Sequence, residues 1–167
     1  MNHGPLLGTL KNGSLVYDRS DSHLHTEYPD IHTVLKTALA DIEPNTNLDV
    51  ATYSHIFPDV IGESIRVPTT SEDEIIFAQR LRRAGLTRFV KNRLLRPTNV
   101  FTVVVKRDKY AAGEQYILIT AYVGEPAPPE PCDTTAAPES VPYWNQNALV
   151  WESVPIIPGT ETSERPW

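Results

Sequence analysis

Cysteine is nearly absent from this sequence of 167 residues, because Cys132 is its only one. A single cysteine excludes an internal disulfide framework and a multi-cysteine zinc site. Its scarcity favours a reducing, cytoplasmic compartment. The sequence also contains no run of 18 apolar residues, so no transmembrane helix and no membrane partner are expected. Residues 1–10 lack the basic-then-apolar order of a signal peptide.

Several motifs that mark common enzymes are also missing. No Gly-rich phosphate loop precedes a helical stretch, and neither G-x-S-x-G nor H-E-x-x-H occurs. Nucleotide hydrolysis by a phosphate loop, serine hydrolysis and zincin chemistry are therefore poorly supported. The 40% of hydrophobic and 22% of charged residues are typical of a globular protein, and the length fits one domain with a short appendage.

Charge is distributed unevenly along the chain. The formal net charge is −6, yet ten of the 15 basic residues lie between Arg80 and Lys109, where Asp108 is the only acid. Such a basic segment predicts an anionic partner, and RNA is the partner we expect. The alternative is a solvated charged face that binds nothing. The side chains expected to contact RNA are Arg80, Arg82, Arg88, Lys91, Arg93 and Arg96.

The composition changes after residue 125. Nine of the 15 prolines and six acidic residues fall in 126–167. Proline fixes φ and removes a backbone donor, so neither a helix nor a central strand is expected there. The aromatic stretch 143–151 indicates an extended strap that docks on the core, with a loose end after Pro158. We therefore expect a core domain over 1–125 and a proline-rich acidic tail over 126–167, which could also shield the basic segment.

Hydrophobic periodicity predicts two main helices. Apolar residues recur at helical spacing over 31–42. A second helix is expected over 70–83, because Ser71 and Glu74 have capping-box spacing and Gly85 suits the position after a helix end.

Segments 99–106 and 115–123 are rich in β-branched and aromatic residues. The polar connection between them predicts an antiparallel pair at the centre of a sheet. Segments 14–17 and 60–67 are shorter strand candidates. The expected fold is α+β, with an antiparallel β-sheet of about four strands, two main helices packed against it, and the proline-rich C-terminal strap.

His23 and His25 form an H-x-H pair. On an extended backbone both imidazoles point to one side, and histidine titrates near neutral pH, which suits proton transfer. The same pair could join His32 and Glu27 or Asp21 in a zinc site, or the histidines could be ordinary surface residues.

Thr120 and Tyr122 have the same alternating spacing at the end of a predicted core strand. Both hydroxyls should project from one face, where they need hydrogen-bond partners or solvent. The alternative is an ordinary half-exposed strand face. Thr102 on the preceding strand is a weaker case of the same kind.

RNA cleavage can use the neighbouring 2′-hydroxyl as nucleophile. It then needs a base, an acid and a cation near the phosphate, and no metal or other cofactor. Either histidine, either strand hydroxyl and an arginine of the basic segment could supply these groups. These residues suggest a metal-independent endoribonuclease.

The segment ILITAYVG over 117–124, a histidine near the chain start and a basic middle together resemble the barnase–EndoU–colicin–RelE superfamily of ribonuclease toxins. The resemblance covers about 22–124. It implies an α+β fold with a four-stranded antiparallel sheet and metal-independent RNA cleavage that leaves a cyclic phosphate. It suggests His25 or His23 as the catalytic histidine, Thr120 and Tyr122 as the strand hydroxyls, and Arg83 among the candidates for the cation. A toxin of this type would have a cognate antitoxin or immunity protein.

Two other functions fit the same residues. The first is a non-catalytic nucleic-acid-binding regulatory protein, in which the basic segment contacts phosphates. The second is a protein-interaction module of a phage or mobile element, with the proline-rich tail as ligand. The sequence indicates no particular oligomeric state.

Overall fold

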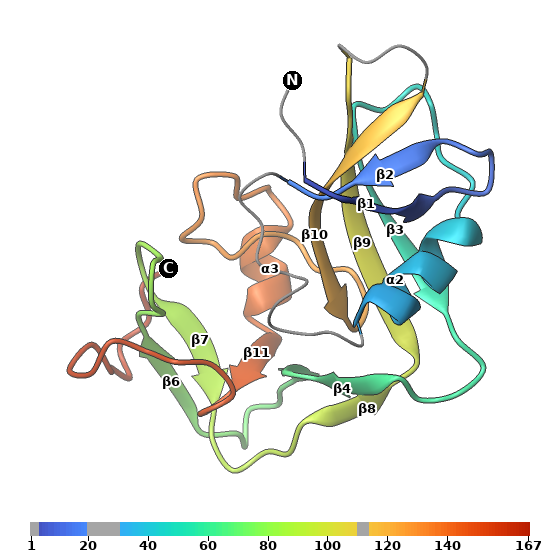
Figure 1. The fold of residues 1–167 in the computed structure, drawn as a ribbon. Helices are drawn as coiled ribbons and strands as arrows, with labels where there is room; N and C mark the ends of the chain where they lie inside the picture. Colours follow the sequence, from blue (N-terminus) through green and yellow to red (C-terminus); the bar gives the residue numbers. More distant parts are fainter. Residues whose placement is uncertain (1–3, 20–30, 110–113) are drawn as a thin grey trace. The chain divides into compact units, whose positions relative to one another are not determined.

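The computed structural model of the chain describes residues 4–19, 31–109 and 114–167. Over these residues it contains eleven strands, two helices and three sheets, with 37% strand against 10% helix (Figure 1). The expected α+β fold, with one sheet of about four strands and two main helices, is therefore wrong, and the protein is mostly β. Neither described helix has the length and apolar character needed to cross a membrane.

The chain divides into two compact units that alternate along the sequence. Unit 1 comprises residues 1–61 and 99–126, and unit 2 comprises residues 62–98 and 127–167. The chain therefore passes between the units at three points, and the proline-rich segment belongs to unit 2 together with the stretch 62–98.

The strands of unit 1 form a five-stranded sheet. In spatial order they are β1 (Leu6–Thr9), β2 (Leu15–Tyr17), β10 (Gln115–Val123), β9 (Val100–Arg107) and β3 (Val50–Ile56). β2 and β10 run parallel, and the other neighbours are antiparallel. The predicted strands 14–17, 99–106 and 115–123 are thus confirmed within a residue or two. The antiparallel pairing of the last two, and their central positions, are also confirmed.

Helix α2 (Ile31–Ala40) packs on one face of this sheet and confirms the helix expected over 31–42 (Figure 1). Leu35 and Leu39 lie one turn apart and are fully buried. They pack in one cluster with Val103 and Val105, which alternate along β9 and face the helix. The core of unit 1 is therefore the contact between a helical stripe and a strand face.

Unit 2 contains a four-stranded and a two-stranded sheet. The larger one has the order β5 (Arg66–Pro68), β11 (Asn147–Val150), β7 (Thr87–Val90) and β6 (Ile75–Ala78). β11 and β7 run parallel, while the other pairs are antiparallel. The smaller sheet pairs β4 (Gly62–Ser64) with β8 (Arg96–Thr98). The strand expected over 60–67 is thus divided between two sheets.

The helix expected over 70–83 is absent, and a turn followed by β6 takes its place. The acidic residues that resembled a capping box form a turn, in which the Asp73 carboxylate accepts a hydrogen bond from the Thr70 amide at 2.8 Å. Ile75, Ile76 and Phe77 then pair with β7, where β-branched and aromatic side chains pack well. Arg82 and Gly85 have positive φ values of 62° and 77°, which a right-handed helix does not allow.

The segment 126–167 is not an extended strap. It contains a short helix, α3 (Ser140–Trp144), and β11, which lies between β5 and β7 inside the larger sheet. Pro142 lies in the first turn of α3, where a backbone N–H would have no partner in the helix, and no proline falls between residues 143 and 154. The expected loose end after Pro158 is also wrong, because Thr162 and Phe77 exchange two backbone hydrogen bonds of 2.8 Å.

Candidate anion-binding site

A pocket of about 270 Å³ lies in unit 2 and is lined by Ile75, Phe77, Arg88, Asn145, Ser163 and Arg165. Phe77 on β6 and Arg88 on β7 are direct cross-strand partners, so their side chains lie on the same face of the sheet. The bridge between Phe77 and Thr162 brings the segment with Ser163 and Arg165 to this face. The pocket is therefore built by a hairpin and by a segment far away in the sequence.

Arg88 is held in place by neutral oxygen atoms. Its Nη1 donates hydrogen bonds of 2.9 Å to Thr69 Oγ1 and to the carbonyl oxygen of Asn147. These bonds orient the guanidinium without neutralising its charge. The remaining N–H groups of this planar donor can therefore serve a ligand.

Arg165 is oriented by an amide. Its Nη2 donates to Asn145 Oδ1 at 2.7 Å, and Trp167 Nε1 donates to the same oxygen at 3.1 Å. The Trp167 ring also meets the ring of Phe77 edge to face, with centroids 5.2 Å apart. Asn145 thus links the second arginine of the pocket to the aromatic packing beneath it.

The pocket brings together two positively charged side chains, Arg88 and Arg165. Neither Arg88 nor Arg165 forms an ion pair with an acidic group among the described residues. Asp73 is a nearby acid that pairs with Arg93 at 3.1 Å, and its charge partly offsets the repulsion at Arg88. Burial, followed by the charge of Arg165, lowers the pKa of the Arg88 guanidinium below its ordinary value. An anion in the pocket would relieve this repulsion.

The other basic residues expected to contact RNA are mostly neutralised within unit 2. Lys91 pairs with Glu74 at 3.6 Å, and Arg93 pairs with Asp73. Arg82 is exposed, and Arg96 lies on β8. The expected continuous cationic surface is therefore interrupted by acidic partners, whereas Arg88 lines the pocket of unit 2.

Arg80 and Arg83 converge on one buried carboxylate of the tail. Their Nη1 atoms lie 3.2 and 3.0 Å from Glu130 Oε2, and Glu130 is only 6% exposed. The idea that the acidic tail shields part of the basic segment is thus confirmed at Glu130. Cys132 lies beside this cluster, where burial and the Glu130 charge raise the pKa of its thiol. A raised pKa disfavours the thiolate, which is the nucleophilic form of cysteine.

The strand hydroxyls of the ribonuclease hypothesis lie in unit 1. The register places Thr120 opposite Val104 and Tyr122 opposite Thr102, so both project from the face of β10 that does not meet α2. A bulge between Leu118 and Thr120 produces this change of face. The Thr102 hydroxyl is fully buried and donates to the carbonyl oxygen of Gly124 at 2.7 Å, which is a structural role.

His23 and His25 lie outside the described residues, so their distance from Thr120 and Tyr122 stays a prediction. Arg83, the cation proposed for the same reaction, belongs to unit 2. The part of the chain that the structure describes also contains no group of three or more histidine, cysteine or acidic side chains placed to hold a metal ion.

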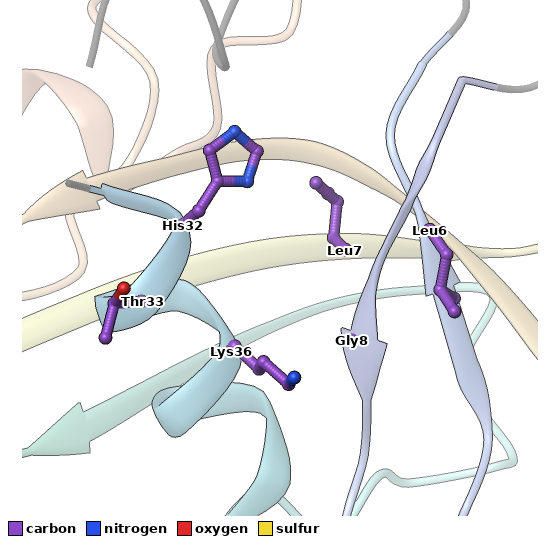
Figure 2. Close-up of a pocket in the computed structure, with 6 residues that line it drawn as sticks. All are labelled: Leu6, Leu7, Gly8, His32, Thr33 and Lys36. Atoms are coloured by element: carbon purple, nitrogen blue, oxygen red, sulfur yellow. The ribbon is translucent and has the colours of Figure 1, made fainter. Parts of the chain in front are cut away.

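A second pocket, of about 300 Å³, lies in unit 1 between β1 and the first turns of α2. Figure 2 shows Lys36 extending from α2 toward β1, with His32 one turn before it. Leu6 and Leu7 make the opposite wall largely apolar. Lys36 provides one permanent charge here, whereas the pocket in unit 2 has two guanidinium groups.

Sequence reasoning identified Arg88 as a candidate but not Arg165, Asn145 or Ser163. Arg165 was noticeable only as the one basic residue of an acidic, proline-rich segment. Its position in the pocket depends on the pairing of residue 162 with β6, which no local pattern indicates. Comparisons of the chain with models of protein families, with curated proteins and with solved structures find no match.

Proposed function

We propose that the protein is a non-catalytic RNA-binding protein, and that unit 2 holds one phosphate of an RNA strand between Arg88 and Arg165. The observation that carries the proposal is the pocket in which two guanidinium groups meet without an acidic partner among the described residues. Arginine suits a phosphate because its planar fork donates two parallel hydrogen bonds.

The size of the pocket favours one unit of a polymer as its ligand. A volume of about 270 Å³ lies just below the usual range of small-molecule sites, which is about 300–1,000 Å³, and it exceeds the space that a phosphate group alone requires. Ile75 and Phe77 form an apolar side that can contact the sugar next to the phosphate. A flexible single strand can turn one phosphate into such a pocket, whereas a rigid duplex presents its phosphates in a fixed row.

The salt dependence of binding follows from the ion pairs of unit 2. Each phosphate neutralised on a single strand contributes about −0.7 to the slope of log K against log salt concentration. One phosphate in the pocket predicts a slope of about −0.7. Six cations that each bind a phosphate would give about −4. The ion pairs of Arg80, Arg83, Lys91 and Arg93 support the smaller value.

The decisive variant is Asn145→Asp. The new carboxylate is isosteric and keeps both hydrogen bonds from Arg165 and Trp167. It also places a negative charge where the phosphate would bind. We expect fluorescence anisotropy with a labelled single-stranded RNA to show at least tenfold weaker binding, with an unchanged thermal unfolding temperature. Arg165→Ala should weaken binding by roughly 10- to 150-fold, because a charged hydrogen bond contributes about 1.5–3 kcal/mol.

Arg82→Ala is the matched control, since Arg82 is an exposed arginine of the same unit and does not line the pocket. It should change the affinity less than twofold. An equal loss in Arg82→Ala and Arg165→Ala would contradict the proposal, because it would indicate diffuse attraction to the surface. Cleavage of the RNA in EDTA that disappears in His25→Ala, His23→Ala or Tyr122→Phe would instead establish the metal-independent endoribonuclease.

A further inference from the structure

The two edges of the sheet in unit 1 differ in how they are protected. β1 is short, with four residues, and its register with β2 shifts between Leu6 and Gly8. β3 has seven residues, VATYSHI, with no proline and no Lys, Arg, Asp or Glu, and its register with β9 is continuous. Short strands, irregular register, proline and charge are the usual devices that keep a sheet edge from pairing. β3 has none of them.

The outward backbone groups of β3 can be assigned from the register. The Arg107 amide donates to the carbonyl of Asp49 at 2.7 Å, and the Phe57 amide donates to Asn99 at 2.8 Å. In an antiparallel ladder these bonds recur at every second residue. The odd-numbered residues therefore bond to β9, and the N–H and C=O groups of the even-numbered residues 50–56 point outward. No described strand pairs with this edge.

Two large apolar side chains mark the ends of the same edge. Val50 is 51% exposed and Ile56 is 68% exposed, and both lie on the face away from α2. Thr52 and Ser54 lie between them on this face and are exposed too. The order along one face of β3 is therefore apolar, hydroxyl, hydroxyl, apolar.

We propose that β3 pairs with β3 of a second copy of this chain in a two-fold symmetric, antiparallel arrangement centred on Tyr53. In this register Val50 lies opposite Ile56 of the partner copy, and Thr52 lies opposite Ser54. A two-fold interface must be complementary to itself. This strand meets that condition, because the pairs match apolar with apolar and hydroxyl with hydroxyl side chains.

The hydrogen-bonding pattern fits the same register. With Tyr53 on the axis, the opposed residues carry numbers that sum to 106, so even-numbered residues face even-numbered ones. The outward amide and carbonyl groups are those of the even-numbered residues, so they meet as hydrogen-bonded pairs. A register shifted by one residue would place them opposite groups already bonded to β9. The five-stranded sheet would continue across the axis as one sheet of ten strands.

The test uses charge reversal at the two exposed ends of the strand in the full chain. We expect the protein to sediment at twice its chain mass of 18.7 kDa at micromolar concentration. The double variants Val50→Glu/Ile56→Glu and Val50→Lys/Ile56→Lys place like charges opposite each other. Each should sediment as a monomer, with unchanged far-UV circular dichroism. An equimolar mixture should regain the dimer, since opposite charges then face each other across the axis.

Leu94→Glu is the matched control, because Leu94 is a highly exposed apolar residue, at 88%, and lies outside β3. It should leave the dimer intact. A monomeric parent protein would overturn the proposal, and so would a dimer that persists in both double variants. A mixture of the two variants that stays monomeric would also overturn it.

Discussion

Gly85 offers a direct test of how the tail is packed in unit 2. Its φ is +77°, and a Cβ added here would overlap the Cβ of Cys132 more closely than two carbon atoms can approach. Gly159 belongs to the same unit and has a similar φ of +89°, but a Cβ there would have no neighbour within 4 Å. Comparing alanine substitutions at the two glycines therefore distinguishes the effect of backbone strain from that of steric overlap.

The expected loss of stability can be estimated for each position. Alanine in the left-handed region costs about 1–2 kcal/mol, and this is the whole expected effect of Gly159→Ala. Gly85→Ala adds an overlap with Cys132, and overpacking of this kind costs about 1–3 kcal/mol more. Gly85→Ala should therefore lower the free energy of unfolding of unit 2 by about 2–5 kcal/mol.

The assay is urea unfolding followed by tryptophan fluorescence, because Trp144, Trp151 and Trp167 are the only tryptophans and all belong to unit 2. The variant Cys132→Gly removes the atoms that the new Cβ would meet. In its background, Gly85→Ala should lose no more stability than Gly159→Ala does. Equal losses at the two glycines in the parent protein would refute the packing of the tail against residue 85.

Three further predictions concern buried and charged groups. Glu130→Gln should lower the free energy of unfolding by about 2–3 kcal/mol in urea, because two arginines lose a buried counter-charge, whereas Glu74→Gln, at an exposed pair, should lower it by less than about 1 kcal/mol. Tyr116→Phe should leave the stability of unit 1 unchanged or raise it by about 1 kcal/mol, because the buried Tyr116 hydroxyl has no hydrogen-bond partner among the described residues; a clear loss in urea unfolding followed by far-UV circular dichroism would reveal one. The Thr70 amide, with a further contribution from Arg93, holds the pKa of Asp73 below its ordinary value, so its stabilising effect is present above the unfolded-state pKa and is lost as pH falls through the lower folded value. Asp73→Asn should therefore make unit 2 less sensitive to acid below about pH 4, as measured by tryptophan fluorescence during acid titration.

The parts of the fold that could be predicted are those specified by local periodicity. The helical stripe with Leu35 and Leu39 and the apolar strands β9 and β10 each bury a face that is evident in the sequence. The prediction of a second helix was wrong, because the spacing of Ser71 and Glu74 is equally compatible with a tight turn. Only the pairing of β6 with β7 decides between a turn and a helix.

The candidate site was even less predictable from local sequence patterns than the second helix. The density of arginines predicted an anionic partner, but most of these arginines meet acids from distant segments, such as Glu130. Arg88 forms no ion pair among the described residues, whereas Arg93 pairs with Asp73. A count of charges in a window cannot show which of them find counter-charges after folding.

The alternation of the two units along the chain has a consequence for synthesis. Unit 1 can be completed when β10 has left the ribosome, but β7 in the earlier stretch 62–98 has its partner β11 only after residues 147–150 follow. One edge of β7 therefore stays unpaired during synthesis until β11 has been made, although all residues of unit 1 are synthesised before that point. A chain that stops near residue 126 would keep this open edge, so we expect it to aggregate or to engage chaperones. The proline-rich segment thus supplies the last strand of the sheet in unit 2. Its pairing with β7 removes the open edge through which the nascent chain could associate with other chains.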